Sequence, residues 1–231
     1  MPATAAIAAH GYVLHIGDEA YSSWSLRGWL LLRAFGLPFR EQTHAMHDPA
    51  FDAYQAGHAP VRTVPMLSFT EGGRDVRVWD TLAIAETLAE RHPDAGHWPR
   101  DPAARGAARA LAAEMHSGFA ALRAAAPMNT RRDKALAPVS PEVRADLDRL
   151  ERLWDWARAL GGGGGPYLFG GAFTAADAFF APVAFRIKGY RLPVGASAAA
   201  YCAALRGHAA VAAWSAAAGA DPRRIALYEA L

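Results

Sequence analysis

The sequence predicts two domains within 231 residues, a small α/β domain followed by an all-helical domain. In the first third, a strand pattern, a helical pattern and a second strand pattern follow one another. Two further strand patterns and a second helical pattern come next, so the order is βαβ followed by ββα. Residues 93–102 are rich in proline, glycine and polar side chains, and every long segment beyond them has helical spacing. We therefore expect a flexible N-terminus at 1–11, an α/β domain at 12–92, a linker at 93–101 and a helical domain at 102–231.

Strands of the first domain are predicted at Tyr12–Ile16, at Phe39–Thr43 after Pro38, and at Val64–Phe69 and Val76–Trp79. The residues Glu71-Gly72-Gly73 form a hairpin turn between the last two strands. Apolar residues from Leu26 onward have helical spacing, and the helix is expected to end at Gly36. A second helix is expected from Asp80 to about His92. Between them, Asp48–Gly57 is expected to form a short turn of helix.

The second domain carries start and stop signals of helices. Asp101-Pro102 supplies an N-cap and a first-turn proline, and Ser140-Pro141 opens another helix, which ends at the glycine run 161–165. Thr174 and Asp177 have the spacing of a capping box. One apolar helix face is expected at Leu111, Met115, Phe119 and Leu122, and two alanine-rich helices at Ala196–Leu205 and His208–Ala218.

Composition excludes several classes of function. The 24 basic and 22 acidic residues are scattered and give a formal charge of +2, so a nucleic-acid or acidic-membrane partner has no support. Cys202 is the only cysteine, which excludes an internal disulfide and suits a reducing compartment. The opening residues lack the basic segment of a signal peptide and no apolar run could span a bilayer, so we expect a cytoplasmic protein. His44, His47 and Asp48 are residue types that can bind a metal ion, but no further ligand lies at a suitable spacing in the sequence. We therefore expect no metal site.

The segment from Tyr21 to Arg27 is the most informative part of the sequence. It lies between a strand and a helix, where backbone N–H groups and the positive end of the helix dipole favour an anion. Ser22 and Ser25 have the spacing of a Cys-x-x-Cys redox turn, but both carry oxygen in place of sulfur. A hydroxyl here can hold a sulfur anion by a hydrogen bond, so any reactive sulfur has to come from a bound ligand.

Two further pairs complete a candidate site. Val64-Pro65 enters a strand through proline, which is typical of a cis bond, and in that geometry the Val64 backbone can pair with an extended peptide. Asp80-Thr81 begins a helix, where Thr81 can bind a carboxylate and Asp80 an ammonium group. The three motifs predict a site for a small zwitterionic peptide whose thiol ends beside Ser22. The simpler alternatives are helix caps at Ser22, Ser23 and Asp80, and an ordinary trans bond at Pro65.

These motifs resemble those of the cytosolic glutathione transferases, and most of all their zeta-like and bacterial serine-type members. The resemblance covers essentially the whole chain after about residue 12 and rests on four motifs in order, at Ser22–Arg27, Val64-Pro65, Asp80–Ile84 and Thr174 with Asp177. It implies a thioredoxin-like domain followed by an all-helical domain, glutathione as co-substrate without a metal, a small hydrophobic electrophile as second substrate, and a homodimer.

The resemblance also implies roles for single residues. Ser22 would face the glutathione sulfur, with Ser23 as the alternative; Val64 would pair with the cysteinyl backbone, and Asp80 and Thr81 would hold the γ-glutamyl end. Two departures from the family pattern lie close to this site. Thr63, with Arg62 beside it, occupies a position that is usually basic or an amide, and Trp24 replaces a cysteine or proline.

The second substrate is expected to contact the helical domain. Candidate lining residues are Met115, His116, Phe119, Arg123, Arg186 and Tyr190. The maleylacetoacetate isomerases of the zeta group share an arginine where Gly189 stands here, and Arg186 lies almost one turn earlier. We therefore expect a transferase, with a glutathione-dependent cis–trans isomerase and a non-catalytic interaction protein as alternatives.

Overall fold

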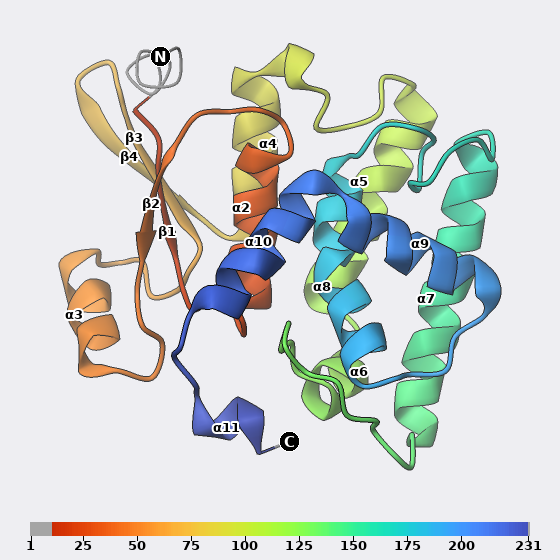
Figure 1. Ribbon diagram of the computed structural model, residues 1–231. Coiled ribbons are helices and arrows are strands. Elements are labelled where there is room, and N and C mark those ends of the chain that lie inside the picture. The colour runs from red at the N-terminus through yellow and green to blue at the C-terminus, as the bar shows by residue number, and fades with distance from the viewer. Residues whose placement is uncertain (1–10, 231) are drawn as a thin grey trace. The chain divides into compact units, whose positions relative to one another are not determined.

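Residues 11–230 of the computed structural model fall into two units, residues 11–97 and 98–230 (Figure 1). Apart from Gly11, the N-terminal segment that we expected to be flexible lies outside the described residues. The segment expected as a linker contains the short 3-10 helix η1 (Pro93–Ala95), followed by His97 and Trp98, which are both buried. No helix among residues 11–230 is long and apolar enough to cross a membrane.

The first unit is built on a sheet with the strand order β2-β1-β3-β4. The strands are β1 (Val13–Ile16), β2 (Arg40–Thr43), β3 (Met66–Glu71) and β4 (Arg74–Trp79). β1 runs parallel to β2 and antiparallel to β3, and β3 and β4 form the expected hairpin through Gly72 and Gly73, which both have positive φ. The predicted strands are thus confirmed, with ends shifted by up to two residues.

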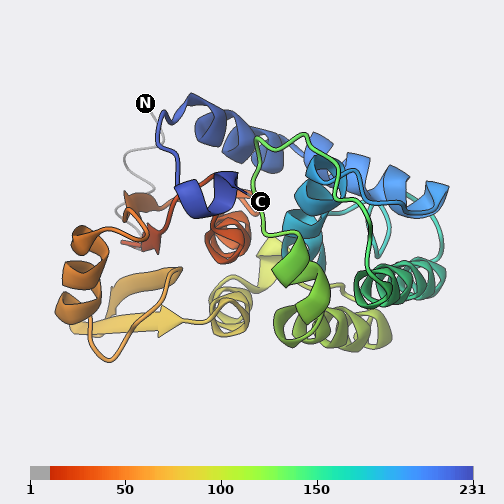
Figure 2. The same ribbon diagram turned by 90° about the horizontal axis from the view of Figure 1, so that it is seen from below.

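Helices cover both faces of this sheet (Figure 2). Leu14 and Ile16 of β1 are fully buried on the face of α2 (Ser23–Arg33) and α4 (Thr81–Arg91), which pack against each other. His15 points to the opposite face because side chains alternate along a strand. There its ring contacts residues Tyr54 and His58, at α3 (Pro49–Gly57) and its C-terminal end.

Two glycines of the first unit lie directly against side chains of neighbouring loops. A Cβ atom at Gly28 of α2 would lie 2.7 Å from Cγ of Pro65, and one at Gly17 would lie 2.7 Å from Sδ of Met46 and 3.2 Å from Val64. The Val64–Pro65 peptide bond is cis, as expected, and both residues are buried. The turn after β1, the loop after β2 and the loop before β3 therefore meet at these glycines.

The second unit is all-helical, and α8 (Ala175–Gly189) forms its buried centre. It packs against α5 (Pro102–Ser117) and α9 (Ala196–Gly207); the others are α6 (Ala120–Ala125), α7 (Pro141–Leu160), α10 (Ala209–Ala220) and α11 (Ala226–Glu229). The capping box is confirmed, since the Asp177 carboxylate accepts hydrogen bonds from both the backbone and the hydroxyl of Thr174 at 2.8 Å. Tyr201 of α9 donates to the same carboxylate at 2.9 Å and ties the two helices together.

Two features of this unit differ from the sequence prediction. The apolar face expected to run along one helix from Leu111 to Leu122 is divided, because α5 ends at Ser117 and Phe119 has a φ of 59°. Phe119 and Leu122 are nevertheless buried, since α6 resumes the helix immediately afterwards. The short helix α11 was not expected.

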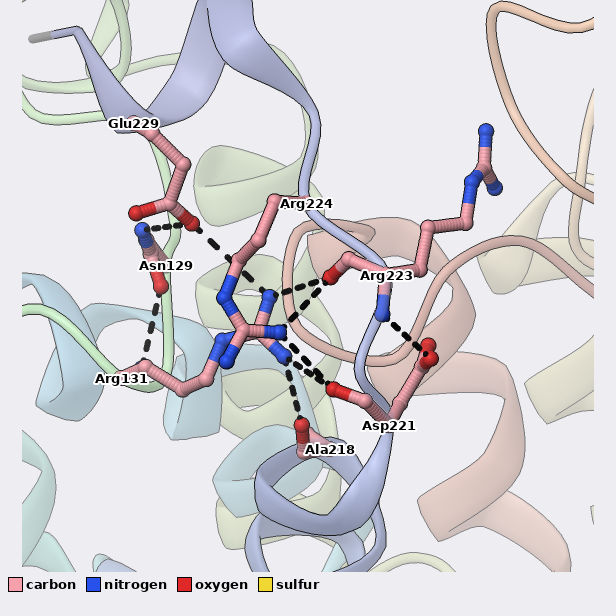
Figure 3. Close-up of polar contacts among 7 residues, drawn as sticks. All are labelled: Asn129, Arg131, Ala218, Asp221, Arg223, Arg224 and Glu229. Atoms are coloured by element: carbon pink, nitrogen blue, oxygen red, sulfur yellow. Dashed lines mark hydrogen bonds and ion pairs between the residues drawn. The ribbon is translucent and has the colours of Figure 1, made fainter.

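A single arginine holds the C-terminal segment that leads to α11 (Figure 3). Arg131 donates to the backbone carbonyl groups of Ala218 at 2.7 Å, Asp221 at 3.1 Å and Arg223 at 3.0 Å. Glu229 of α11 receives a hydrogen bond from Asn129 at 3.2 Å and pairs with Arg131 at 3.8 Å. The hydrogen bonds join residues 87 to 100 positions apart in the sequence, so a pattern along the chain could not reveal them.

The contact of α2 with Pro65 gives a first prediction. Gly28→Ala forces a Cβ atom against a rigid proline ring, and we expect it to lower the free energy of unfolding by about 1–3 kcal/mol. Gly106→Ala in α5 is the matched control, because a Cβ there meets nothing within 4 Å and helix propensity favours alanine. Thermal unfolding followed by circular dichroism compares the two. Equal stability of the two variants would show that the contact does not constrain α2.

Candidate functional site

The three sequence motifs meet at one edge of the sheet. Met66 at the start of β3 pairs with Trp79 at the end of β4, so Val64-Pro65 and Asp80-Thr81 leave the same end of the hairpin. His15 of β1 also pairs with Met66, and the turn that leads to Ser22 begins two residues later at this same edge. The antiparallel register thus brings together residues that lie up to 59 positions apart in the sequence.

Ser22 is the N-cap of α2 and is 7% exposed. Its hydroxyl oxygen accepts a hydrogen bond from the backbone N–H of Ser25 at 3.2 Å and donates to the hydroxyl of Ser25 at 2.7 Å. Ser25 Oγ accepts in turn from the backbone N–H of Gly17 at 2.9 Å. The capping role that we considered as an alternative is therefore real, and it holds the Ser22 hydroxyl at the positive end of the helix dipole.

The two neighbours of Ser22 in the motif have different surroundings. Ser23 is the first residue of α2 and is also buried, at 8% exposed. The Trp24 ring lies under the guanidinium group of Arg27, at 4.3 Å from ring centroid to Cζ, and Arg27 is itself buried. This cation–π contact keeps Trp24 beside the turn, in the position where the resemblance places a smaller residue.

Arg62 and Thr63 are fixed by their backbones and expose their side chains. The carbonyl group of Thr63 accepts from the Tyr54 hydroxyl at 3.3 Å, and that of Arg62 accepts from the Gln55 side chain. Because α3 makes both contacts, it holds the loop that enters the cis proline. Both side chains remain accessible to a ligand.

Asp80 and Thr81 form the N-terminus of α4 and carry two unusual features. Asp80 caps the helix by accepting from the backbone N–H of Leu82 at 2.8 Å, but with a φ of 75° it is strained for a residue other than glycine. Thr81 is 1% exposed, and its hydroxyl has no hydrogen-bond partner within residues 11–230. A buried hydroxyl without a partner costs free energy, which makes this position a candidate for ligand binding.

Several of the residues expected to line the second-substrate pocket are buried or form hydrogen bonds with the backbone. Met115, Phe119 and Tyr190 are buried, and the Tyr190 hydroxyl donates to the carbonyl group of Pro127 at 2.9 Å. His116 and Arg123 are half-buried and are joined by a 3.0 Å hydrogen bond from the guanidinium group to the His116 carbonyl. Burial lowers the pKa of Arg123.

Arg186 is 4% exposed and donates to the carbonyl groups of Ala126 and Arg123 around the end of α6. Burial lowers its pKa to about 10, helped by the positive charge of Arg123, so the side chain stays charged at neutral pH. Gly189 lies against the backbone of Arg132, where a Cβ atom would come within 3.1 Å of the carbonyl oxygen. The arginine that the resemblance to the isomerases implies at this position therefore has no direct equivalent here.

Within residues 11–230 no cluster of histidine, cysteine and acidic side chains is arranged to hold a metal ion. His44 instead stacks on His15, with ring centroids 5.3 Å apart. Cys202 is buried, and burial raises its pKa to about 12, which makes the thiol unreactive.

Sequence reasoning missed the contact between the Ser22 and Ser25 hydroxyls and the two glycines that bring the loops together. The spacing of Ser22 and Ser25 was the available signal for the first, since an N-cap and the third helical residue always lie close. The glycines carried no comparable signal, because a helical glycine shows its packing partner only in three dimensions.

Comparisons with known proteins agree with this architecture. The family model described as "Glutathione S-transferase, N-terminal domain" matches residues 21–91, and that described as "Glutathione S-transferase, C-terminal domain" matches residues 134–217. The two matches together cover about two thirds of the chain. No curated protein sequence matches the chain significantly.

Solved structures extend the likeness to nearly the whole chain. A glutathione transferase homolog from Burkholderia GL BGR1, crystallised with bound glutathione, is 20% identical and covers 91% of this chain and 99% of its own, with a TM-score of 0.64. A maleylacetoacetate isomerase from Anaeromyxobacter dehalogenans 2CP-1, with bound dicarboxyethyl glutathione and citrate, is 27% identical, with coverages of 90% and 93% and a TM-score of 0.54. Glutathione transferase Omega 1C from Trametes versicolor is 17% identical, with coverages of 90% and 95% and a TM-score of 0.63.

The first and third of these structures show the fold alone, and the set does not single out the zeta-like group. The order of the two domains, the thioredoxin-like sheet, the central capped helix α8 and both family matches lead to the same conclusion. The chain belongs to the glutathione S-transferase family.

Proposed function

We propose that this protein binds glutathione at the sheet edge formed by its three motifs, ionises the thiol and adds it to a small hydrophobic electrophile. The observation that carries the proposal is the buried hydroxyl of Thr81, which has no hydrogen-bond partner among residues 11–230, beside the strained Asp80 at the N-terminus of α4. The γ-glutamyl carboxylate would accept a hydrogen bond from Thr81 and favour the positive end of the helix, while Asp80 would bind the ammonium group. Val64 would pair with the cysteinyl backbone, with Arg62, Thr63 and Trp24 near the remainder of the peptide.

In the proposed mechanism Ser22 acts as a hydrogen-bond donor to the sulfur and not as a base. The thiol proton leaves to solvent, and the thiolate is stabilised by the hydroxyl and by the N-terminus of α2. To donate to sulfur, Ser22 has to turn its proton away from Ser25. Ser25 can then donate to Ser22 while still accepting from Gly17, because a hydroxyl has one donor and two acceptor positions. Ser25 would thus position Ser22 and strengthen its donated hydrogen bond.

A glutathione-dependent isomerase of the maleylacetoacetate type is the second candidate. The 27% identical structure with a glutathione adduct supports it. Two observations favour conjugation. Arg186 already donates to backbone carbonyl groups, and Gly189 is tightly packed, so neither position offers a free cation to a dicarboxylate substrate. Comparing turnover of a dicarboxylate cis–trans substrate with turnover of an aromatic electrophile separates the two activities. A homodimer remains our expectation from the family, and analytical ultracentrifugation tests it.

Thr81→Val tests the glutathione site directly. Because the Thr81 hydroxyl has no hydrogen-bond partner in the described part of the chain, we expect valine to leave the free energy of unfolding unchanged or to raise it. The same change should weaken glutathione binding about tenfold, through the loss of one hydrogen bond to a charged group. Isothermal titration calorimetry measures the affinity, and Thr70→Val on the opposite face of the sheet is the control. Wild-type affinity in Thr81→Val would rule out this placement of the γ-glutamyl end.

Thiol ionisation tests the role of the serines. We expect Ser22→Ala to raise the pKa of bound glutathione by about one unit, Ser25→Ala to raise it by less, and Ser23→Ala to leave it unchanged. Thiolate absorbance in the ultraviolet, recorded against pH at saturating glutathione, gives these values. Ser22→Ala also loses a helix cap, at a cost of about 1 kcal/mol, so Ser22→Thr serves as the variant that keeps cap and hydroxyl. A shift in Ser23→Ala alone would move the assignment to Ser23.

A further inference from the structure

We propose a second binding site, for a small phosphomonoester, on the sheet face that carries α3, away from the glutathione site. A cavity of about 270 Å³ opens on this face, and its lining includes Arg40, Ser68, Thr70 and Arg77. None of these four residues belongs to the three motifs described above. The site does not depend on the proposed function.

The strand register explains how the cavity is built. Arg40, Val13, Ser68 and Arg77 pair in succession across the sheet and form a single row, one residue from each strand. Paired residues point to the same face, so the two arginines stand at the ends of a floor made by the smaller Val13 and Ser68. His58, at the C-terminal end of α3, also lines the cavity, and its ring contacts His15 in the neighbouring row of this face.

The charges in this row are not neutralised by any residue that the structure describes. Within the part of the chain that the structure describes, the side chains of Arg40 and Arg77 make no ion pair or hydrogen bond. The neighbouring acids Glu41 and Glu71 point to the other face, where they bind Trp29 at 2.7 Å and Arg91 respectively. The sequence of residues 1–10, which precede the lining residue Gly11, contains no acidic residue.

Among the described residues that line the cavity, Asp75 is the only acidic one, and it accepts a hydrogen bond from the Thr70 hydroxyl at 3.4 Å. One carboxylate against two guanidinium groups leaves the cavity with a net positive charge. Burial lowers the pKa of the adjacent His15 to about 4, with smaller contributions from the positive charges of His58, His44 and Arg77. His15 is therefore neutral at pH 7, and the position of Arg77 close to it agrees with a guanidinium group directed along this face.

The donors around the cavity match a phosphate group. Guanidinium groups bind phosphate oxygens in bidentate geometry, and Arg40 and Arg77 supply two of them. The Ser68 hydroxyl lies 3.4 Å from both the Val13 carbonyl oxygen and His15 Nε2, and the Thr70 hydroxyl donates to Asp75, so the two arginines carry the recognition of the phosphate. The volume is close to the lower limit of small-molecule sites and exceeds that of a bare phosphate, which leaves room for a small organic group. A doubly charged phosphomonoester would neutralise both arginines at once.

Titration with phenyl phosphate tests this site, with phenol as the uncharged comparison. We expect saturable binding of phenyl phosphate and none of phenol, measured by amide chemical shifts in NMR spectra. Arg40→Gln and Arg77→Gln should each weaken binding about tenfold. The matched control is Arg74→Gln, because Arg74 is an exposed arginine on the same strand as Arg77 but points to the opposite face. It should bind as the wild type does.

The titration is repeated at saturating glutathione, where the affinity for phenyl phosphate should be unchanged. No saturation up to about 10 mM phenyl phosphate would overturn the proposal, as would an equal loss of affinity in Arg74→Gln. Competition by glutathione would also overturn it, because the phosphate would then occupy the edge that carries Ser22 and Thr81. Failure of glutathione to bind at all would refute the proposed function and leave this site standing.

Discussion

Direct contact between the backbone of helix α2 and the Pro65 ring is the constraint on which the candidate site depends. Pro65 lies where the side chain of residue 28 would be, so the helix can occupy its position only with glycine there. The contact sets the distance between the turn that carries Ser22 and the loop that carries Val64. Gly17 leaves room for the Met46 side chain of the loop after β2, which is flexible and so constrains that loop less. The contact between Gly28 and Pro65 thus holds the Ser22 turn and the Val64 loop close together.

The polar groups at this edge would suit two anionic groups of one peptide, its thiolate and its γ-glutamyl carboxylate. Ser22 lies at the N-terminus of α2 and Thr81 at the N-terminus of α4, and each helix directs the positive end of its dipole to the same edge of the sheet. A thiolate and a carboxylate would each have a hydroxyl and a helix terminus to stabilise them. The strain at Asp80 agrees with this reading, because strained backbone persists where function or surrounding packing requires it.

Much of this site could be predicted from the sequence, because its signals are local. An N-cap serine, a proline that enters a strand and an Asp-Thr pair before a helix each act within a few residues. The break between α5 and α6 could not be predicted, since Met115, Phe119 and Leu122 keep the spacing of one continuous helix and only the positive φ of Phe119 interrupts it. The row from Arg40 to Arg77 was missed for another reason. Its members are adjacent only through the register of four strands, which the sequence pattern does not specify.

The central claim is that the protein takes its reactive sulfur from glutathione and stabilises it with the hydroxyl of Ser22. A crystal structure of the complex with glutathione tests this claim most directly. We expect the sulfur within hydrogen-bonding distance of Ser22 Oγ, with the γ-glutamyl carboxylate at Thr81 and the cysteinyl backbone paired with Val64. A sulfur atom distant from Ser22, or a peptide bound elsewhere on the first unit, would contradict the account.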